Sequence, residues 1–303
     1  MNIKAAKQFI LQNARPIDLA IYQYYFENQS NQMVSVELLN YQNKDGGFGN
    51  GLESDFLNPN SSPIATNDAI ITLFRVGALI KDSEMVKGIV KYLDSHDSFD
   101  EDKKRWLFAI ESNKDYPHAI WWEKNDTDGI SGFNPTISLA AFMVCYGKET
   151  TLYKNIIKEG LKYLEEHEDI SGEELKCYLL AYEMLTQNNI GEIIDLGYLE
   201  ELIRKRVGSI ICKDIAKYGV EYVTVPSDIF SGIYLEFITP EIAPLIDAEK
   251  AVLDKLQKED GGYDITWQWY TLYSEFEQAR NNWRPRVTTE KLLFYGIQNM
   301  REQ

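Results

Sequence analysis

Apolar residues recur along this chain at the spacing of helices with one buried face. In the clearest segments they fall at every third or fourth position with polar residues opposite: 83–95, 151–167 and 196–212. The same pattern is weaker in three further segments: 2–12, 33–43 and 246–258. Helices of this kind are half buried, so the pattern predicts six outer helices that cover a core.

A second set of segments is apolar on nearly every side. Residues 134–147 place Ile137, Leu139, Phe142 and Met143 around the whole helix, and 67–80 and 175–186 are similar. A helix that is hydrophobic all round is buried. We therefore expect six inner helices, near 16–28, 63–80, 134–147, 172–187, 226–237 and 287–300.

Helix start signals support this alternation of outer and inner helices. Four inner segments carry a proline where a first helical turn would begin: Pro16, Pro63, Pro135 and Pro226. Asn134 is placed to cap the helix behind Pro135, and Ser171 with Glu174 predicts a capping box. The expected fold is all-α, an (α/α)6 toroid of six inner and six outer helices, in one domain over residues 1–303.

Two distant stretches share one motif, Gln-x-x-Asp-Gly-Gly-aromatic. We call residues 42–48 the first clasp and residues 257–263 the second clasp. Each follows an expected outer helix. We expect Gly47 and Gly262 to adopt positive φ, the Asp to bond nearby backbone, and the aromatic ring to cover the turn. The duplication indicates a chain built from repeats.

The clasp motif resembles the QW-type repeat of terpenoid cyclases and protein prenyltransferase β subunits. Three blocks also resemble small bacterial proteins described as prenyltransferase-like: residues 47–55 (GFGNGLESD) with 61–66 (SSPIAT), 116–123 (YPHAIWWE), and 282–284 (NWR) with Thr288 and Thr289. The resemblance implies the α/α toroid fold. It assigns no reaction, because the prenyltransferase-like group has no secure activity.

Composition limits the classes of partner. The chain has 303 residues, of which 44% are hydrophobic, so it can bury a large core, and its formal charge of −16 disfavours a nucleic-acid partner. The amphipathic start and the lack of long apolar runs predict a cytoplasmic protein without membrane insertion. Cys145, Cys177 and Cys212 lie in apolar helices, which predicts buried thiols and no disulfide.

The links between helices are unequal in length. Several outer-to-inner links are long (43–62, 96–133, 213–225 and 259–286), whereas inner-to-outer links are mostly short. In an alternating ring, all links of one kind lie at one end. Long loops in compact domains are usually functional, so we expect a site at that end.

The long loops supply the candidate site residues. The expected catalytic groups are Glu53, Asp55 and His118, and the expected substrate-binding groups are Trp121, Trp122, Trp267, Trp283 and Arg284. Carboxylates among aromatic rings lose hydration, which raises a pKa and favours acid/base chemistry. We expect these side chains to line one concave pocket of about 300–1,000 Å³.

Each candidate also has a structural alternative. Glu53 and Asp55 can serve only to bond loop backbone, and His118 can be a packed, satisfied histidine. Because Trp121 and Trp122 are adjacent in sequence, we expect one of them to be structural. Arg284 can pair with a loop carboxylate instead of a substrate.

Three classes of function remain open. The chain lacks the Asp-x-Asp-Asp acid of hopene-type cyclases, so carbocation cyclisation is not indicated. It also lacks the Asp-rich metal motif of terpene synthases and the Asp-x-Cys zinc ligands of prenyltransferases, so no metal or cofactor is expected, and divalent-cation binding by the loop carboxylates stays open. The first class is an enzyme doing acid/base chemistry on an apolar, isoprenoid-like small molecule. The second is a carbohydrate-active hydrolase or lyase, and the third is a non-catalytic binding or scaffold protein. An apolar tunnel favours the first, an open groove with carboxylates the second, and a filled centre the third. The oligomeric state stays open.

Overall fold

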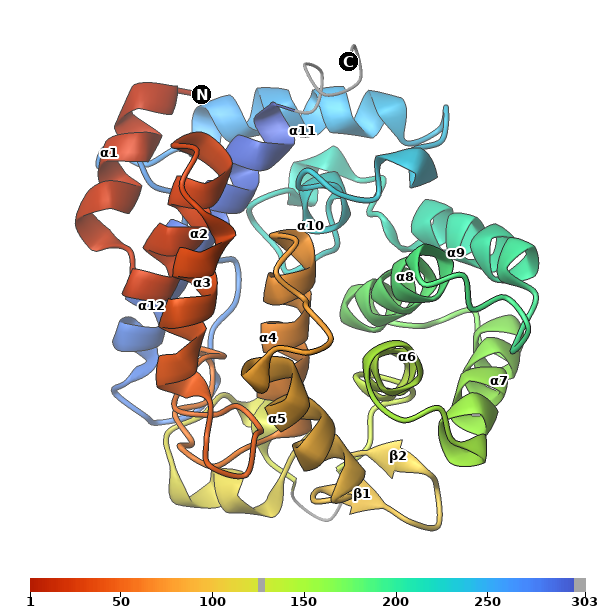
Figure 1. Cartoon of the computed structure of the whole chain (residues 1–303). Helices are drawn as coiled ribbons and strands as arrows, with labels where there is room; N and C mark the ends of the chain where they lie inside the picture. The colour runs from red at the N-terminus through yellow and green to blue at the C-terminus, as the bar shows by residue number, and fades with distance from the viewer. Residues whose placement is uncertain (125–128, 297–303) are drawn as a thin grey trace. The chain divides into compact units, whose positions relative to one another are not determined.

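Helices dominate residues 1–124 and 129–296, which are the residues that the computed structural model describes. The α-helices in these ranges are α1 (Ile3–Asn13), α2 (Pro16–Phe26), α3 (Asn31–Leu38), α4 (Pro63–Arg75), α5 (Glu84–Asp94), α6 (Thr136–Tyr146), α7 (Thr151–Glu166), α8 (Gly172–Gln187), α9 (Leu196–Ile210), α10 (Pro226–Ile229), α11 (Ala243–Leu256) and α12 (Phe276–Tyr295) (Figure 1). Within the described ranges the strands are β1 (Phe99–Asp100) and β2 (Arg105–Trp106), an antiparallel pair. The all-α class is confirmed.

The short helices of the 3₁₀ type lie in the connections. They are Leu39–Tyr41, Glu111–Asp115, Ile120–Trp122, Ile215–Lys217 and Leu235–Phe237. Two of them, Glu111–Asp115 and Ile120–Trp122, lie in the long link between α5 and α6, where the sequence predicts loop. No helix within the described residues combines the length and the apolar character needed to cross a bilayer.

Two of the expected inner helices are wrong in extent. The segment expected at 226–237 is α-helical only as α10, which ends at Ile229. Tyr234, which precedes the 3₁₀ helix Leu235–Phe237, has a left-handed φ of 59° that a continuing α-helix cannot contain. Conversely, α12 begins at Phe276, well before the expected start at 287, and contains Pro285 inside it. Residues 297–300 of that expected segment lie outside the described residues.

Two of the expected caps also need correction. Pro135 itself is the N-cap of α6, and Asn134 instead accepts a weak bond from the Cys177 thiol, with 3.4 Å between Oδ1 and Sγ. Ser171 caps α8 as expected, because its hydroxyl accepts from the Glu174 N–H at 3.1 Å. The Glu174 carboxylate does not complete a capping box. It accepts from the backbone N–H of Phe133 at 2.7 Å and so ties the loop before α6 to α8.

The chain packs as two units, which we describe separately. Unit 1 comprises the described residues of Met1–Glu37, Val207–Gln268 and Ser274–Gln303, and unit 2 comprises Leu38–Arg206 with Trp269–Tyr273. The six-by-six ring and its single domain stay predictions.

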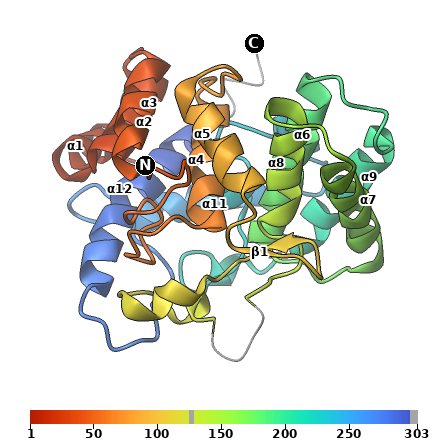
Figure 2. The ribbon, with the colours of Figure 1, turned by 60° about the horizontal axis from the view of Figure 1, so that its bottom comes forward.

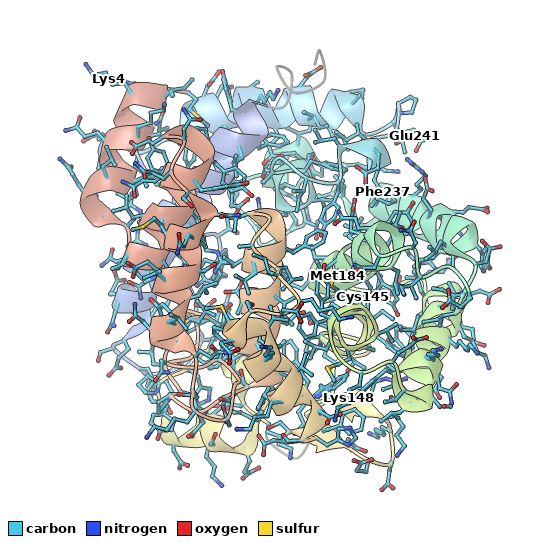
Figure 3. All side chains as sticks on the ribbon, in the orientation of Figure 1. Lys4, Cys145, Lys148, Met184, Phe237 and Glu241 are labelled. Carbon is cyan, nitrogen blue, oxygen red and sulfur yellow. The ribbon has the colours of Figure 1, made fainter. Side chains whose placement is uncertain are left out.

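Unit 2 is built around α6, which packs against both α7 and α8 (Figures 1 and 2). Every residue of α6 from Thr136 to Cys145 is buried, as the all-round apolar pattern predicts. Cys145 faces Met184 of α8 and donates to its carbonyl, with 3.5 Å between sulfur and oxygen (Figure 3). Cys145 and Cys177 are buried free thiols, as expected, whereas Cys212 is only half buried.

Unit 1 has its own core between α1, α2 and α12. Ala6, Phe9 and Ile10 of α1 pack with Tyr22 of α2 and Leu292 of α12. The apolar positions of α1 recur every third or fourth residue, so they share the face that meets α12. The first and last described helices of the chain are therefore neighbours.

The two clasps have the same bond pattern. In the first, Gln42 Nε2 donates to the Gly46 carbonyl at 3.0 Å and Asp45 Oδ1 accepts from the Gly47 N–H at 2.9 Å. In the second, Gln257 bonds Gly261 at 2.8 Å and Asp260 bonds Gly262 at 3.0 Å. The motif predicted from sequence is therefore one structure used twice.

Each clasp also bonds a threonine of the next α-helix in the chain. The N–H of Phe48 donates to Thr66 Oγ1 of α4 at 3.1 Å, and the N–H of Tyr263 donates to Thr288 Oγ1 of α12 at 3.0 Å. A third connection makes the same bond without the motif, because Trp106 of β2 donates to Thr136 Oγ1 at 3.0 Å. A threonine of the following α-helix is thus the element common to all three connections.

The glycines of the clasps work differently from the expectation. Positive φ occurs at the first glycine of each pair, 101° at Gly46 and 91° at Gly261. The second glycine is needed for space: a Cβ on Gly47 would stand 2.6 Å from Ser61 Cβ, and one on Gly262 would stand 2.6 Å from the Phe9 ring. The first glycine of each pair therefore combines positive φ with a close approach to another helix, and the second glycine is required for space alone.

Candidate functional site

Three loop segments that are far apart in sequence lie side by side in unit 2. The N–H of Leu57 donates to the Pro117 carbonyl at 2.9 Å, and the N–H of Ala119 donates to the Asp55 carbonyl at 2.8 Å. The N–H of Ile120 donates to the Trp269 carbonyl at 2.9 Å. These backbone bonds place Glu53, Asp55, His118, Trp121 and Trp122 in one loop cluster.

Asp55 is held at both ends inside this cluster. Its side chain is buried, and Oδ1 accepts from the indole N–H of Trp269 at 2.6 Å. Its backbone N–H donates to Glu53 Oε1 at 3.1 Å, so both carboxylates bond loop groups. The indole N–H thus satisfies the hydrogen-bonding need of a buried carboxylate oxygen. The same bond holds the 269–273 segment against the 53–57 loop.

His118 is 1% exposed and has one fixed nitrogen. Nδ1 lies 2.6 Å from the Tyr116 carbonyl, which can only accept, so Nδ1 carries a proton. Nε2 has no hydrogen-bond partner among the described residues and lies 3.7 Å from Glu123 Oε1. In the neutral imidazole, Nε2 therefore carries a lone pair that can accept a proton. In the imidazolium, Nε2 carries a proton that faces the Glu123 carboxylate.

Trp122 and Trp121 take different places, as their adjacency predicts. Trp122 is buried, stacks on Phe108 with 4.6 Å between ring centroids, and meets Phe56 edge-on at 5.0 Å. Trp121 is half buried. Trp122 therefore packs the loop cluster, and Trp121 is the one of the two with surface to offer a ligand.

The other predicted substrate-binding residues belong to unit 1. Trp267 and Trp283 meet edge-on with 5.5 Å between centroids, and Tyr222 packs against Trp267 at 5.9 Å. The Arg286 guanidinium lies 5.2 Å from the Trp283 ring centre. Trp283 and Arg286 are on α12 and not on a loop, which corrects the expected position of both.

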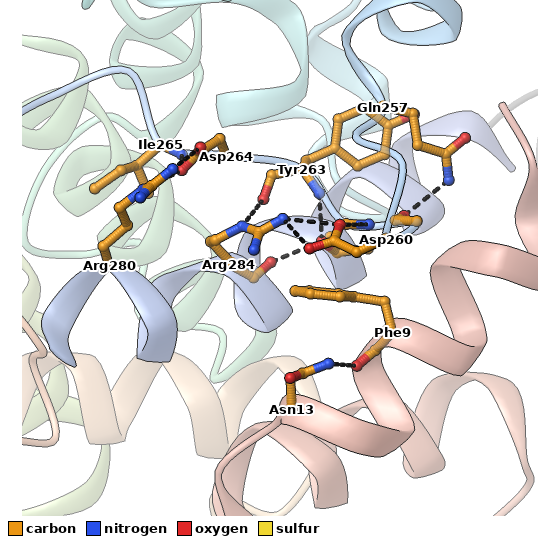
Figure 4. A network of polar contacts seen from close by, with 12 residues as sticks. Phe9, Asn13, Gln257, Asp260, Tyr263, Asp264, Ile265, Arg280 and Arg284 are labelled. Carbon is orange, nitrogen blue, oxygen red and sulfur yellow. Dashed lines mark hydrogen bonds and ion pairs between the residues drawn. The ribbon is translucent and has the colours of Figure 1, made fainter. Parts of the chain in front are cut away.

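Arg284, also on α12, is part of the second clasp (Figure 4). Its Nη2 donates to both oxygens of Asp260 at 2.9 Å, and its Nε donates to the Tyr263 carbonyl at 3.3 Å. The guanidinium also covers the Phe9 ring at 4.7 Å. These contacts favour the structural alternative for Arg284.

Replacing Arg284 by Ala should lower the free energy of unfolding by about 1–2 kcal/mol, because a carboxylate bond and a cation–π contact are lost together. Arg284→Lys should recover less than half, since an ammonium cannot match the planar geometry. Urea denaturation measures both variants. Equal stability of the wild type and Arg284→Ala would contradict the clasp role.

An open groove of about 800 Å³ lies beside the first clasp in unit 2. Its polar lining consists mainly of amides and hydroxyls from separate segments: Asn43, Asn50, Asn60, Ser61, Ser98 and Ser112. None of the eight predicted site residues lines it. The groove is polar and lacks aromatic walls, unlike the pocket predicted from sequence.

Sequence reasoning missed a buried charged cluster in unit 1. Glu249 of α11 is 2% exposed, Ser227 of α10 is 3% exposed, and Lys291 of α12 donates to the Ser227 hydroxyl and pairs with Glu249 at 3.4 Å. Burial raises the pKa of Glu249, while the Lys291 charge and the Ser227 bonds oppose that rise. Only the fold reveals the cluster, because each residue by itself looks like a surface residue.

The comparisons with known proteins place this chain in no group. No family model, no curated protein and no solved structure matches it. Among the described residues, no three His, Cys, Asp or Glu side chains are grouped so as to hold a metal ion. Function therefore rests on the geometry of the chain itself.

Proposed function

We propose that this chain is an enzyme that moves protons to and from a small molecule at His118 and Glu123. The observation that carries the proposal is the buried Nε2 of His118, which has no hydrogen-bond partner among the described residues and lies 3.7 Å from Glu123. A buried polar atom without a partner is costly, so such atoms are kept where they have a use. A histidine of fixed tautomer beside a carboxylate is an arrangement suited to general acid/base catalysis.

The buried His118 and the partly exposed Glu123 have different roles in the proposed proton transfer. His118 accepts or donates the proton through Nε2, because Nδ1 is occupied by the Tyr116 carbonyl. The Glu123 side chain is 36% exposed and can exchange that proton with solvent. Asp55 and Glu53 act on the loop backbone and position His118 through the neighbouring Ala119.

The surroundings of His118 favour an apolar substrate. The centroid of the Tyr273 ring lies 5.4 Å from that of the imidazole. The backbone of His118 forms an antiparallel bridge with that of Phe56, whose ring meets Trp122 edge-on. Aromatic walls exclude water and bind apolar groups, including isoprenoid chains. The faces of these aromatic rings can also stack on a sugar ring. The experiment below therefore includes oligosaccharides as substrates, to test the carbohydrate-active alternative.

The fold proposed for this enzyme is the (α/α)6 toroid. Support comes from the alternation of amphipathic helices such as α5 and α7 with buried helices such as α6 and α8. The second clasp lies against α1, where a Cβ on Gly261 would stand 2.4 Å from the Ala5 carbonyl. In the first clasp the equivalent Gly46 approaches Gly88 of α5. A last clasp that contacts the first helix is expected when repeats close into a ring.

The test is a turnover screen with isoprenoid alcohols, isoprenoid diphosphates and neutral oligosaccharides, followed by mass spectrometry. His118→Gln and Glu123→Gln should each lower kcat by about 10²–10⁴-fold with the fold retained. His167→Gln is the matched control, since His167 bonds the Tyr163 carbonyl through Nδ1 in the same way but is exposed. Its activity should equal that of the wild type.

The outcomes separate the three classes of function. Turnover of an isoprenoid that depends on His118 supports the proposal. Turnover of oligosaccharides alone assigns the carbohydrate-active class instead. Activity that survives both substitutions, or binding without turnover of any substrate, refutes acid/base catalysis at this pair.

A further inference from the structure

The groove beside the first clasp is a concave surface, formed by described residues of unit 2, that the proposed reaction does not use. Its volume of about 800 Å³ lies within the range of small-molecule sites, about 300–1,000 Å³. Three carboxylates (Asp45, Asp97 and Glu111) and one cation (Lys44) accompany the amides and hydroxyls of its lining. The apolar contribution comes from Pro59 and Ile110.

The walls of the groove are fixed by hydrogen bonds. Asn43 Nδ2 donates to the Pro59 carbonyl at 2.9 Å and to Ser61 Oγ at 3.0 Å, while its Oδ1 accepts from Asn50 at 3.1 Å. Ser61 Oγ in turn donates to Asp45 Oδ1 at 2.8 Å. Polar groups held in place before binding lose little conformational entropy when a ligand arrives, so this groove is preorganised.

The second clasp shows what distinguishes the first. Ser61 precedes Thr66 by five residues, and Trp283 precedes Thr288 by the same five. The small serine leaves room next to Asp45, whereas next to Asp260 the Arg284 guanidinium stacks on Phe9. The two copies of the motif therefore differ in the partner of the aspartate, a serine at the first copy and an arginine at the second, while Asp45 and Asp260 are both exposed.

We propose that the groove beside the first clasp binds a neutral polyhydroxylated molecule of the carbohydrate class. Adjacent hydroxyls of a ligand act as both donors and acceptors, and a lining of amides, hydroxyls and carboxylates offers partners for both roles. Three carboxylates against one lysine disfavour an anionic ligand. The carboxylates are also engaged: Asp45 with Ser61, Asp97 with Ser98, and Glu111 with Lys114, so a polycation gains little.

Calorimetric titration tests the site with gluco-, xylo- and chito-oligosaccharides as probes. At least one probe should bind with a Kd in the micromolar to millimolar range. Lys44→Trp fills the groove and should weaken that binding by about 10-fold or more. Glu259→Trp is the matched control, because Glu259 holds the same exposed position in the second clasp as Lys44 does in the first.

Two further measurements separate this site from the proposed reaction. His118→Gln should leave oligosaccharide affinity unchanged, since His118 does not line the groove. Asn60→Trp, at an exposed position in another segment of the lining, should repeat the effect of Lys44→Trp. The proposal is overturned if no oligosaccharide binds, if spermidine binds instead, if Glu259→Trp weakens binding as much as Lys44→Trp, or if His118→Gln abolishes it.

Discussion

Valine in place of Gly46 or Gly261 is expected to lower the free energy of unfolding by about 3–5 kcal/mol, because backbone strain and steric overlap act together. Gly46 has φ 101°, and a Cβ there would stand 2.0 Å from the Gly88 carbonyl oxygen of α5. At Gly261, φ is 91° and the Cβ would stand 2.4 Å from the Ala5 carbonyl oxygen of α1. Both obstacles are backbone atoms, which cannot rotate away.

Gly77 provides the control that separates the two causes. It is exposed with φ 66°, and a Cβ there would have nothing within 4 Å. Gly77→Val should therefore cost only the strain, about 1–3 kcal/mol. Thermal and urea unfolding of the three variants measures the difference. If Gly46→Val and Gly77→Val prove equally stable, the close approach of clasp and helix has no energetic role.

The success of the sequence in predicting helices depended on how strongly each was patterned. Helices α5, α6, α7 and α8 were predictable because their apolar positions recur over several turns. One residue that departs from such a pattern does not change the prediction of a helix. The start of α12 was missed because residues 276–284 are mostly polar and Pro285 imitates a start signal. The early end of α10 was missed because apolar residues that follow Ile229, such as Phe230 and Phe237, are buried without continuing the α-helix.

The candidate site was only partly predictable for a different reason. Local motifs identified Asp55 and His118 as unusual, and the two do lie in one loop cluster. The partner of Asp55 is Trp269, 214 positions away, and no periodicity links them. Glu123 was visible in the same block as His118, yet its distance to the imidazole depends on the turn of the Ile120–Trp122 helix. Contacts across long loops depend on tertiary packing, which a single sequence does not specify.

Replacing Lys291 by Met should lower the free energy of unfolding at neutral pH by about 3–5 kcal/mol, because it leaves the Glu249 carboxylate buried without its cation. Glu249 keeps its bond from the Ser227 N–H at 2.8 Å and its bond from the Ser227 hydroxyl. Neither donor carries a full charge. Circular dichroism with urea unfolding measures the loss, and Lys255→Met, an exposed change on α11, serves as the control.

The pH dependence of that loss tests its electrostatic origin. Burial raises the folded-state pKa of Glu249 above its unfolded value, and removing the Lys291 charge, which opposes the rise, should raise the pKa further. A raised carboxyl pKa favours the folded protein below the unfolded pKa, about 4.3, and this contribution is lost as pH rises through the folded pKa. The gap in stability between wild type and Lys291→Met should therefore widen from pH 5 to pH 8.

Adding Glu249→Gln to Lys291→Met should recover part of the stability and remove most of the pH dependence, because the second change eliminates the unpaired charge. The interaction energy from the double-mutant cycle should then be about 1–3 kcal/mol. Two results would contradict the ion-pair explanation: a gap as large at pH 5 as at pH 8, or a double variant no more stable than Lys291→Met alone. Either would mean that the Lys291 side chain stabilises unit 1 by filling space among α10, α11 and α12, and that its charge contributes little.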